Sequence, residues 1–99
     1  MGVGTALFEE MELEEGRVQN PSFASYKIPS ALDAPEMITV IVEEPHSQGP
    51  CGAKGLGEPA LAPTAAAIAN AIYAAVGVRI KDLPITPDKI LEGLKKGKK

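Results

Sequence analysis

The sequence predicts a small single domain of the α+β class that spans residues 1–99. A helical apolar spacing opens the chain, a β-branched run stands near its middle, and two segments with helix start and stop signals close it. A glycine-rich loop separates the β-branched run from the last two helices. The expected order is therefore a helix, an extended arm, one or two strands, the loop and two helices, built around the modest core that 99 residues allow.

The first helix is predicted over residues 2–11, where apolar side chains recur at helical spacing from Val3 to Met11. No N-cap residue precedes it, so the helix is expected to begin upstream of Met1. Residues 15–17 signal a turn. The two prolines of residues 20–29 favour an extended arm that lies across a neighbouring surface.

The clearest strand is predicted at residues 37–42, which are mostly β-branched and apolar on both faces. Such a strand should be covered on both sides, which is hard to achieve in a chain of 99 residues. Residues 78–80 are predicted as a second short strand or an extended link.

Two helices are predicted in the second half of the chain. The first runs from an N-cap at Thr64 to about Val76 and ends at Gly77. It is apolar all round with small side chains, which favours a buried helix. The second begins at Thr86-Pro87-Asp88 and ends at Gly93 or Gly97.

The charges of the chain are spread unevenly. Residues 1–50 hold nine acids and two bases, whereas residues 51–99 hold eight bases and four acids. Four of these bases close the chain on residues 95–99, which are expected to form a disordered basic tail. Without interleaved aromatic side chains, this tail argues against nucleic-acid binding.

Further exclusions follow from composition. No apolar run approaches the ~20 residues of a membrane span, and no secretory signal is visible at the N-terminus. A single cysteine, Cys51, allows no internal disulfide. A cytoplasmic location is therefore expected.

The glycine-rich loop at residues 49–59 holds four glycines, two prolines and a single carboxylate, Glu58. It lacks the Gly-Lys-Ser/Thr ending of a phosphate-binding loop. Residues 55–60 match the dinucleotide pattern G-x-G-x-x-A, but the predicted strand ends about a dozen residues too early to feed it. An anion-receptive nest of backbone N–H groups with Lys54 stays open.

The side chains in and near this loop offer two candidate sites. Cys51 and His46 are too few for a zinc site, and no third group orients them as a nucleophile and its base. Glu58, held between Gly57 and Pro59 before a buried helix, is the stronger candidate, as a general base. An exposed loop carboxylate is the alternative.

The loop Gly49–Pro59 resembles the active-site loop of the molybdenum hydroxylases, the family of xanthine dehydrogenase, aldehyde oxidoreductase and aerobic carbon monoxide dehydrogenase. The resemblance covers nearly the whole chain. The other segments that carry it, in order, are Gly2–Glu10, Glu15–Arg17, Asn20–Phe23, Tyr26–Pro29, Ile68–Ile72, Gly77–Ile80 and Leu83–Pro87.

The resemblance implies that the chain is the C-terminal segment of a molybdopterin-binding large subunit. It implies that Glu58 is the catalytic base beside the molybdenum of a molybdopterin cofactor, in the oxidative hydroxylation of a small molecule such as a purine or an aldehyde. The backbone of Gly55, Leu56 and Gly57, with Lys54, would then contact the cofactor, and no residue of the chain would bind the metal. Iron–sulfur centres and FAD would lie on other domains or subunits.

The chain departs from this family chiefly in its length, because the family's catalytic subunit is several times longer. A segment completed by the remaining part of the subunit, and inactive alone, is therefore expected. The alternative is a stand-alone remnant that associates with itself and acts as a non-catalytic binding or interaction module. In either case, the isolated chain is expected to expose large apolar patches.

Overall fold

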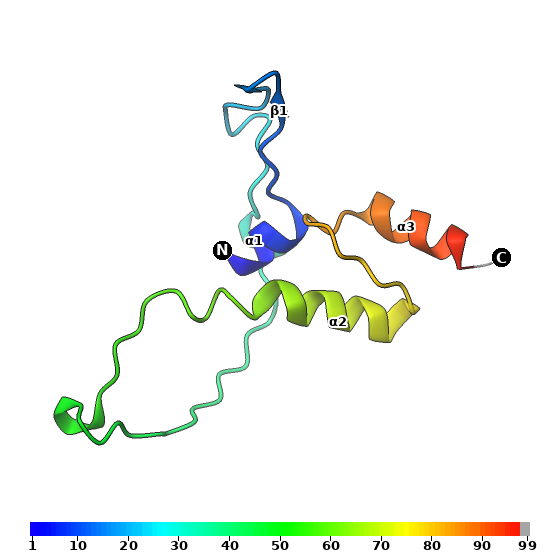
Figure 1. Ribbon diagram of the computed structural model, residues 1–99. Coiled ribbons are helices and arrows are strands. Elements are labelled where there is room, and N and C mark those ends of the chain that lie inside the picture. Colours follow the sequence, from blue (N-terminus) through cyan, green and yellow to red (C-terminus); the bar gives the residue numbers. More distant parts are fainter. Residues whose placement is uncertain (98–99) are drawn as a thin grey trace.

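The chain forms helices and one small sheet, so the α+β class is confirmed in its coarse form (Figure 1). The computed structural model describes residues 1–97. The regular elements, in order, are α1 (Gly2–Leu7), β1 (Leu13–Glu14), β2 (Arg17–Val18), the 3₁₀ turns η1 (Ala31–Asp33) and η2 (Pro50–Gly52), α2 (Thr64–Val76) and α3 (Pro87–Lys96).

The molecule is extended, with a hairpin, a long loop and α3 projecting from a small centre (Figure 1). Its radius of gyration is 17.9 Å, whereas a compact chain of this length has about 13 Å. Its accessible surface is 8465 Å², against about 5,400 Å² for a globular protein of the same mass. Most of the chain therefore lies outside any core of its own.

The centre of the molecule is the packing of α1 against α2 and the segment before α3. Ala6 of α1 is fully buried, and Ile85 is 2% exposed. The backbone N–H of Ile85 donates to the carbonyl of Ala6 at 2.7 Å. A side chain at Gly2 would run into Thr64 of α2, so the small residues of α1 are what allow the helices to approach.

The hairpin pairs β1 with β2 in antiparallel register, with Leu13 opposite Val18. Glu15 and Gly16 form its turn with φ values of 48° and 79°. Two successive positive φ angles are typical of the tight turn that matches strand twist, and glycine adopts them without steric cost. The predicted turn at residues 15–17 is therefore confirmed, although the two short strands beside it were not predicted.

Asn20 stabilises the base of this hairpin. It is the one buried polar residue of the described chain, 7% exposed. Its Nδ2 donates to the carbonyl of Glu10 at 2.7 Å, and its Oδ1 accepts from the N–H of Glu12 at 3.0 Å. Both backbone groups are thus paired by one side chain, as buried polar groups require.

The predicted ends of α2 are partly confirmed. Gly77 ends the helix with a φ of 71°, a left-handed conformation that favours glycine. Thr64 was predicted as the N-cap, but Pro63 holds that position, and the Thr64 hydroxyl donates to the carbonyl of Ala60 at 3.2 Å. A proline can hold it because the N-cap amide needs no helical partner.

The predicted start of α3 is confirmed. Thr86 is its N-cap and accepts from the N–H of Lys89, and Pro87 and Asp88 stand in the first turn. The Lys89 ammonium donates to the carbonyl of Pro84 at 2.8 Å. These bonds tie α3 to the segment that carries Ile85.

The predicted disorder from residue 95 onward is wrong for Lys95 and Lys96, which form the last turn of α3. Cations stabilise a helix C-terminus, and Lys96 also pairs with Glu92 at 3.4 Å. The helix ends at Gly97, one of the two predicted ends. Residues 98–99 of the predicted tail lie outside the described residues.

The strand predicted at residues 37–42 is absent from the described part of the chain, and residues 78–80 form the extended link that was predicted as the alternative to a second strand. Residues 37–42 and 78–80 are extended but unpaired, because no neighbouring strand of residues 1–97 lies beside them. The first helix also ends at Leu7, four residues before its predicted end.

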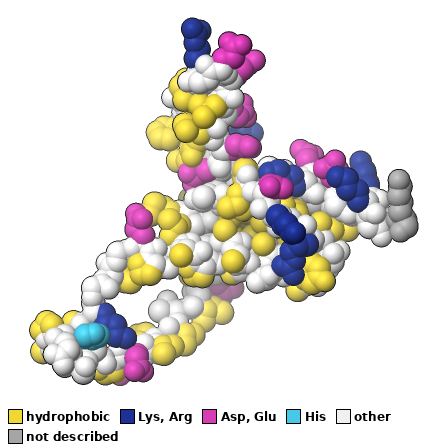
Figure 2. Space-filling model, in the orientation of Figure 1, with side chains coloured by type: hydrophobic (Ala, Val, Ile, Leu, Met, Phe, Trp, Pro, Cys, Tyr) yellow, Lys and Arg dark blue, Asp and Glu magenta, His cyan; other side chains and the backbone are white. Residues whose placement is uncertain are grey.

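The predicted burial of α2 is likewise wrong for this chain, because α2 has no buried residue. Among the helices and strands of residues 1–97, α1 is its main partner (Figure 1). Figure 2 shows apolar side chains at the surface of the hairpin, the centre and the loop. The expectation of exposed apolar patches is confirmed for residues 1–97.

The role of Asn20 predicts that Asn20→Ala loosens the hairpin base. The change leaves the Glu10 carbonyl and the Glu12 N–H without their partner, at a cost of about 1–3 kcal/mol. Amide hydrogen exchange of Glu12 should become about 10-fold faster. Gln19→Ala is the matched control, since the Gln19 side chain is exposed and makes one 3.3 Å hydrogen bond, while the backbone bond of Gln19 to Glu12 is kept; equal exchange in both variants would contradict the role of Asn20.

Candidate functional site

The glycine-rich loop is the far part of a long excursion between η1 and α2 (Figure 1). Its tip is closed by its own backbone. The N–H of His46 donates to the carbonyl of Gly52 at 3.0 Å, and Gly49 N–H donates to the carbonyl of His46 at 3.1 Å. The tip is therefore a structured turn, and not a flexible connection.

The limb that leads from the tip toward α2 has a bare backbone at Gly55 and Gly57. A Cβ atom at either position would meet nothing within 4 Å, and neither residue has a left-handed φ. Gly49 differs, because a Cβ there would collide with the carbonyl oxygen of Ala53. The packing of the tip thus explains why residue 49 is a glycine. No contact within residues 1–97 explains why residues 55 and 57 lack side chains.

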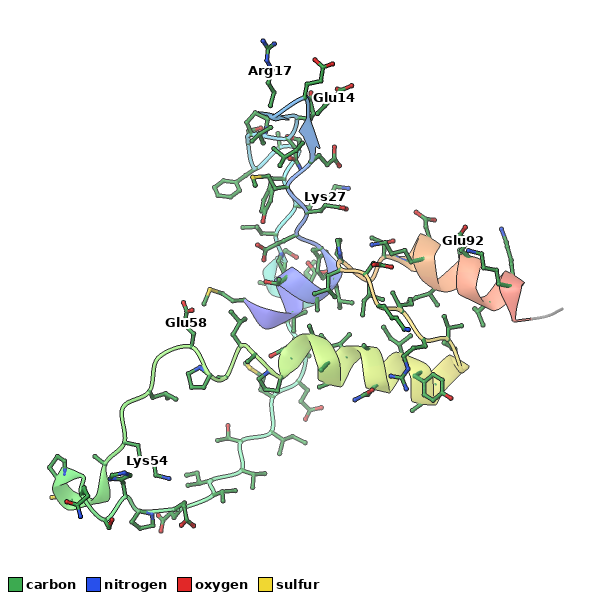
Figure 3. All side chains as sticks on the ribbon, viewed as in Figure 1. Glu14, Arg17, Lys27, Lys54, Glu58 and Glu92 are labelled. Atoms are coloured by element: carbon green, nitrogen blue, oxygen red, sulfur yellow. The ribbon has the colours of Figure 1, made fainter. Side chains whose placement is uncertain are left out.

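Leu56, between the two glycines, is 80% exposed. Lys54 stands at the tip end of the limb, and Glu58 stands at its other end, near α1 (Figure 3). Both side chains are exposed, and within the described residues neither makes a hydrogen bond or an ion pair. The structure therefore places the predicted site residues on one limb without joining Lys54 to Glu58.

Glu58 lies where the limb turns into α2. Its carbonyl accepts from the N–H of Leu61 at 2.9 Å, which closes a turn. A shallow hollow of about 270 Å³ adjoins its side chain, lined by Met1, Gly2, Gly57, Glu58, Ala60 and Leu61. The turn fixes the backbone of Glu58, while the carboxylate is free to meet a group outside the chain.

Cys51 and His46 both lie on the tip. Cys51 is exposed and has a left-handed φ of 54°. His46 uses its Nδ1 to accept from the N–H of Gln48 at 3.2 Å. Within residues 1–97, no group of three His, Cys, Asp or Glu side chains is placed to hold a metal ion.

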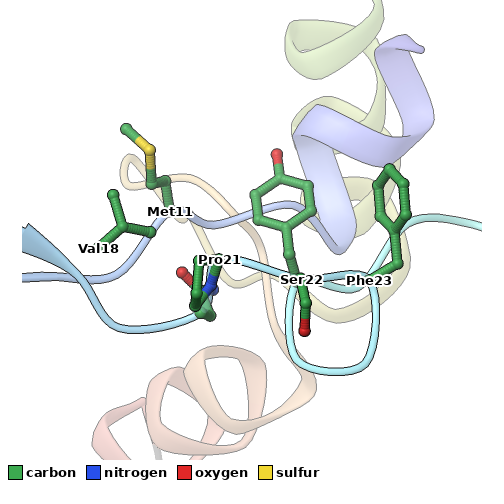
Figure 4. A pocket seen from close by; sticks show the side chains of 7 residues that line it. Met11, Val18, Pro21, Ser22 and Phe23 are labelled. Carbon is green, nitrogen blue, oxygen red and sulfur yellow. The ribbon is translucent and has the colours of Figure 1, made fainter.

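A second concavity lies between the hairpin and the arm (Figure 4). It measures about 410 Å³ and is mostly apolar, with Met11, Val18, Pro21 and Phe23 among its lining residues. The sequence indicated it only indirectly, through the prediction that the arm at residues 20–29 lies across a neighbouring surface. Asn20 lies at its edge with both its Oδ1 and its Nδ2 hydrogen-bonded to backbone groups.

Tyr26 joins the arm to the end of α1. Its hydroxyl donates to Oε2 of Glu9 at 3.0 Å. This hydrogen bond, partial desolvation and the negative charge of Glu9 all favour the neutral phenol, so the pKa of Tyr26 is raised above 10.0. The contact is therefore complete below that ordinary pKa and is lost as the pH rises through the raised value.

The arrangement is a bare backbone limb that ends at one exposed carboxylate. A family model described as "Molybdopterin cofactor-binding domain" matches residues 1–35. The putative xanthine dehydrogenase molybdenum-binding subunit XdhA of Escherichia coli K12 is 46% identical over 94 residues, which cover 93% of this chain and 12% of XdhA. The aldehyde oxidoreductase of Megalodesulfovibrio gigas is 43% identical over 97 residues, which cover 95% of this chain and 10% of the relative.

The fold of the chain also matches a solved structure. The crystal structure of quinoline 2-oxidoreductase from Pseudomonas putida 86 matches 96% of this chain with a TM-score of 0.81 and 31% identity, over 13% of its own length. The chain corresponds to a segment of the molybdenum-binding subunits of xanthine dehydrogenase and aldehyde oxidoreductase, as its motifs predicted. It spans about an eighth of the length of XdhA.

Two further findings concern the helices of the chain and the reach of the family model. Among residues 1–97, no helix has the length and apolar character needed to cross a bilayer. The limb at Gly55 to Glu58 lies outside the residues that the family model matches.

The sterics of the loop predict different effects for three glycine-to-alanine changes in the isolated chain. Gly49→Ala should disturb the tip, because the new methyl group meets the Ala53 carbonyl. Gly55→Ala and Gly57→Ala should leave it unchanged, because the space beside them is open. The amide chemical shifts of His46 and Gly52 measure this difference, and equal shifts in all three variants would contradict it.

The Tyr26–Glu9 contact predicts that Glu9→Ala lowers the pKa of Tyr26 toward 10.0, because the variant loses the acceptor and its charge. Ultraviolet titration of the phenol in a Tyr73→Phe background, where Tyr26 is the remaining tyrosine, measures the change. Glu10→Ala is the control and should leave the titration of Tyr26 in place. A pKa that stays raised in Glu9→Ala would refute the assignment.

Proposed function

We propose that this chain forms part of the molybdopterin-binding subunit of a molybdenum hydroxylase, in which Glu58 is the base for oxidative hydroxylation. The substrate would be a small organic molecule, such as a purine or an aldehyde. The observation that carries the proposal is the limb at residues 54–58, where a bare backbone leads to an exposed carboxylate. The similarity to xanthine dehydrogenase and aldehyde oxidoreductase subunits supports the reaction class.

The limb fits a bulky cofactor. Glycine at positions 55 and 57 lowers the stability of an extended segment unless the missing side chains make room for something. Nothing within this chain fills that room. The backbone at Gly55, Leu56 and Gly57 is therefore proposed to lie against the molybdopterin, with the Lys54 ammonium available to an anionic group of it.

When bound, the molybdenum cofactor supplies the two-electron oxidation, and the electrons leave through iron–sulfur centres and FAD carried elsewhere. In this reaction, the role of this chain is to hold and move a proton. A carboxylate that hydrogen-bonds the reacting group accepts its proton. The backbone turn between Glu58 and Leu61 keeps Glu58 at one position relative to α2.

The proposal includes the rest of a molybdopterin-binding subunit, because the matched segment is 10–13% of the relatives' length. The remaining part of a molybdopterin-binding subunit would cover the exposed faces of α2 and the loop. The isolated chain is proposed to be inactive. The alternative, a non-catalytic binding or interaction module, shares the exposed apolar surface and differs in needing no carboxylate at residue 58.

The test uses a hybrid enzyme, in which this chain replaces the matching segment of the Megalodesulfovibrio gigas aldehyde oxidoreductase. Glu58→Gln should lower the rate of aldehyde oxidation by about 10²–10⁴-fold while molybdenum content is kept, because the amide has the size of the carboxylate but accepts no proton. Turnover with an artificial electron acceptor and metal analysis measure both.

Glu14→Gln is the matched control, because Glu14 is an exposed carboxylate of the hairpin (Figure 3). It should leave the rate unchanged. A Glu58→Gln hybrid that turns over at the parent rate would overturn the base assignment and favour the interaction module.

A further inference from the structure

We propose that the hollow between residues 79–82 and α3 binds a phosphate-type dianion. Inorganic phosphate, a phosphate monoester and the headgroup of phosphatidic acid share this chemistry. The hollow includes Glu92 of α3, which lies on the opposite side of the molecule from Glu58 (Figure 3). The inference therefore concerns a second site and does not rest on the proposed function.

The hollow measures about 390 Å³ and lies between two segments of the chain. Residues 79–82 form one wall, and one face of α3 forms the other. The segment before the first wall touches α3, because a Cβ atom at Gly93 would collide with the side chain of Val78. A glycine at position 93 therefore allows the close approach that creates the hollow.

The hollow carries an excess of positive charge. Two carboxylates, Asp82 and Glu92, line it together with four cations, which are Arg79, Lys81, Lys89 and Lys96. The Glu92 carboxylate lies 3.4 Å from the Lys96 ammonium, and this is the one ion pair among residues 1–97. Lys and Arg side chains gather on the side of the molecule that carries α3 (Figure 2). Because like charges in one hollow repel one another, an anion between them is stabilising.

Arg79 is held in place by partners that leave its charge unpaired. Its guanidinium carbon lies 4.0 Å from the centroid of the Tyr73 ring, and its Nη1 donates to Oδ1 of Asn70 at 2.7 Å. Within residues 1–97, four of its five N–H donors have no protein acceptor. A positioned guanidinium with free donors matches the oxygen geometry of phosphate, to which it can donate two parallel hydrogen bonds.

Lys89 is also fixed without losing its charge to a carboxylate. Its ammonium donates to the carbonyl oxygens of Pro84 at 2.8 Å and Asp82 at 3.4 Å. One of its three donors is therefore left for an anion. Lys81 is exposed and makes no hydrogen bond or ion pair within the described chain, so its ammonium is free to turn toward a bound anion.

The chemistry of the hollow favours phosphate over other anions. A single carboxylate would balance half of the excess charge, whereas a phosphate dianion balances all of it. Phosphate oxygens also accept several hydrogen bonds at once, which suits donors that approach from two walls. The bound anion would join residues 79–82 to α3 and stabilise their relative placement. An acidic protein surface, represented by poly-glutamate, is the alternative that the experiment must exclude.

The experiment follows the amide chemical shifts of the full 99-residue chain during a titration with inorganic phosphate at pH about 8, where phosphate is mostly a dianion. Saturable shifts are expected at Lys81, Asp82 and Gly93, with a dissociation constant in the millimolar range because exposed ion pairs are weak. Sodium chloride at the same ionic strength is the control and should give no saturable shift there. Equal responses to phosphate and chloride would indicate general screening of charge and overturn the proposal.

Two lysine variants test whether the hollow itself binds the anion. Lys81→Gln should weaken phosphate binding about 5-fold, which is the effect of one exposed ion pair. Lys54→Gln makes the same change of net charge on the glycine-rich loop, where Lys54 is exposed, and should leave the affinity unchanged. Equal losses of affinity in the two variants would contradict the site.

A glutamate variant should change the affinity in the opposite direction. Glu92→Gln removes the carboxylate that pairs with Lys96, so phosphate should bind about 5-fold more tightly. Glu14→Gln makes the same change of net charge on the hairpin, where Glu14 is exposed, and should have no effect. An affinity that is unchanged in Glu92→Gln, or that rises equally in both variants, would overturn the proposal.

Vesicles distinguish the two sources of the phosphate. Sedimentation compares phosphatidylcholine vesicles that contain phosphatidic acid with vesicles of phosphatidylcholine alone. Binding to the first kind that is weakened in Lys81→Gln would support a lipid headgroup, whereas a response to inorganic phosphate without vesicle binding would support a free phosphate compound. The absence of a response to both phosphate and vesicles would overturn the proposal, and a response to poly-glutamate alone would indicate a surface for an acidic protein.

Discussion

The hydrogen bond from the N–H of Ile85 to the carbonyl of Ala6 joins two segments that lie almost eighty residues apart in the chain. Ala6 accepts this bond where α1 packs on α2, and Ile85 fills the space beside it. The arm, the loop and α3 all leave from this point (Figure 1). A larger side chain than Ala6 would separate the helices, and the projecting segments would lose their common origin.

Outside that centre, the chain is held by local hydrogen bonds. Asn20 closes the hairpin, and Lys89 ties α3 to the residues before it. Arg79 lies over the ring of Tyr73, 4.0 Å from its centroid, and donates to Oδ1 of Asn70 at 2.7 Å. These contacts fix the shape of each segment while leaving its apolar face open, as in a part that is shaped to fit a larger body.

Three local predictions are confirmed because their causes are local. The left-handed end at Gly77, the cap at Thr86 and the turn at residues 15–17 each depend on a few neighbouring residues. The strand at residues 37–42 and the burial of α2 were predicted from apolar patterns. Such patterns indicate only that the apolar side chains need to be buried. The patterns do not indicate which part of a protein buries these side chains, and in the isolated chain the side chains are exposed.

The site was predictable to the same degree. Glycine spacing and a lone carboxylate pointed to the limb at residues 54–58, and the resemblance to a family gave that limb a chemistry. The sequence could not separate the glycines by cause. Only the structure shows that Gly49 is required by its own turn, whereas Gly55 and Gly57 have open space beside them.

The closed tip has a consequence for how this loop can vary. Because residues 46–53 bond among themselves and Glu58 is fixed by a turn outside them, the tip is a separate unit mounted on two limbs. Residues such as Cys51 and Gln48 can be exchanged there without moving the carboxylate. A protein built this way can alter what its loop meets while the carboxylate of Glu58 stays in register.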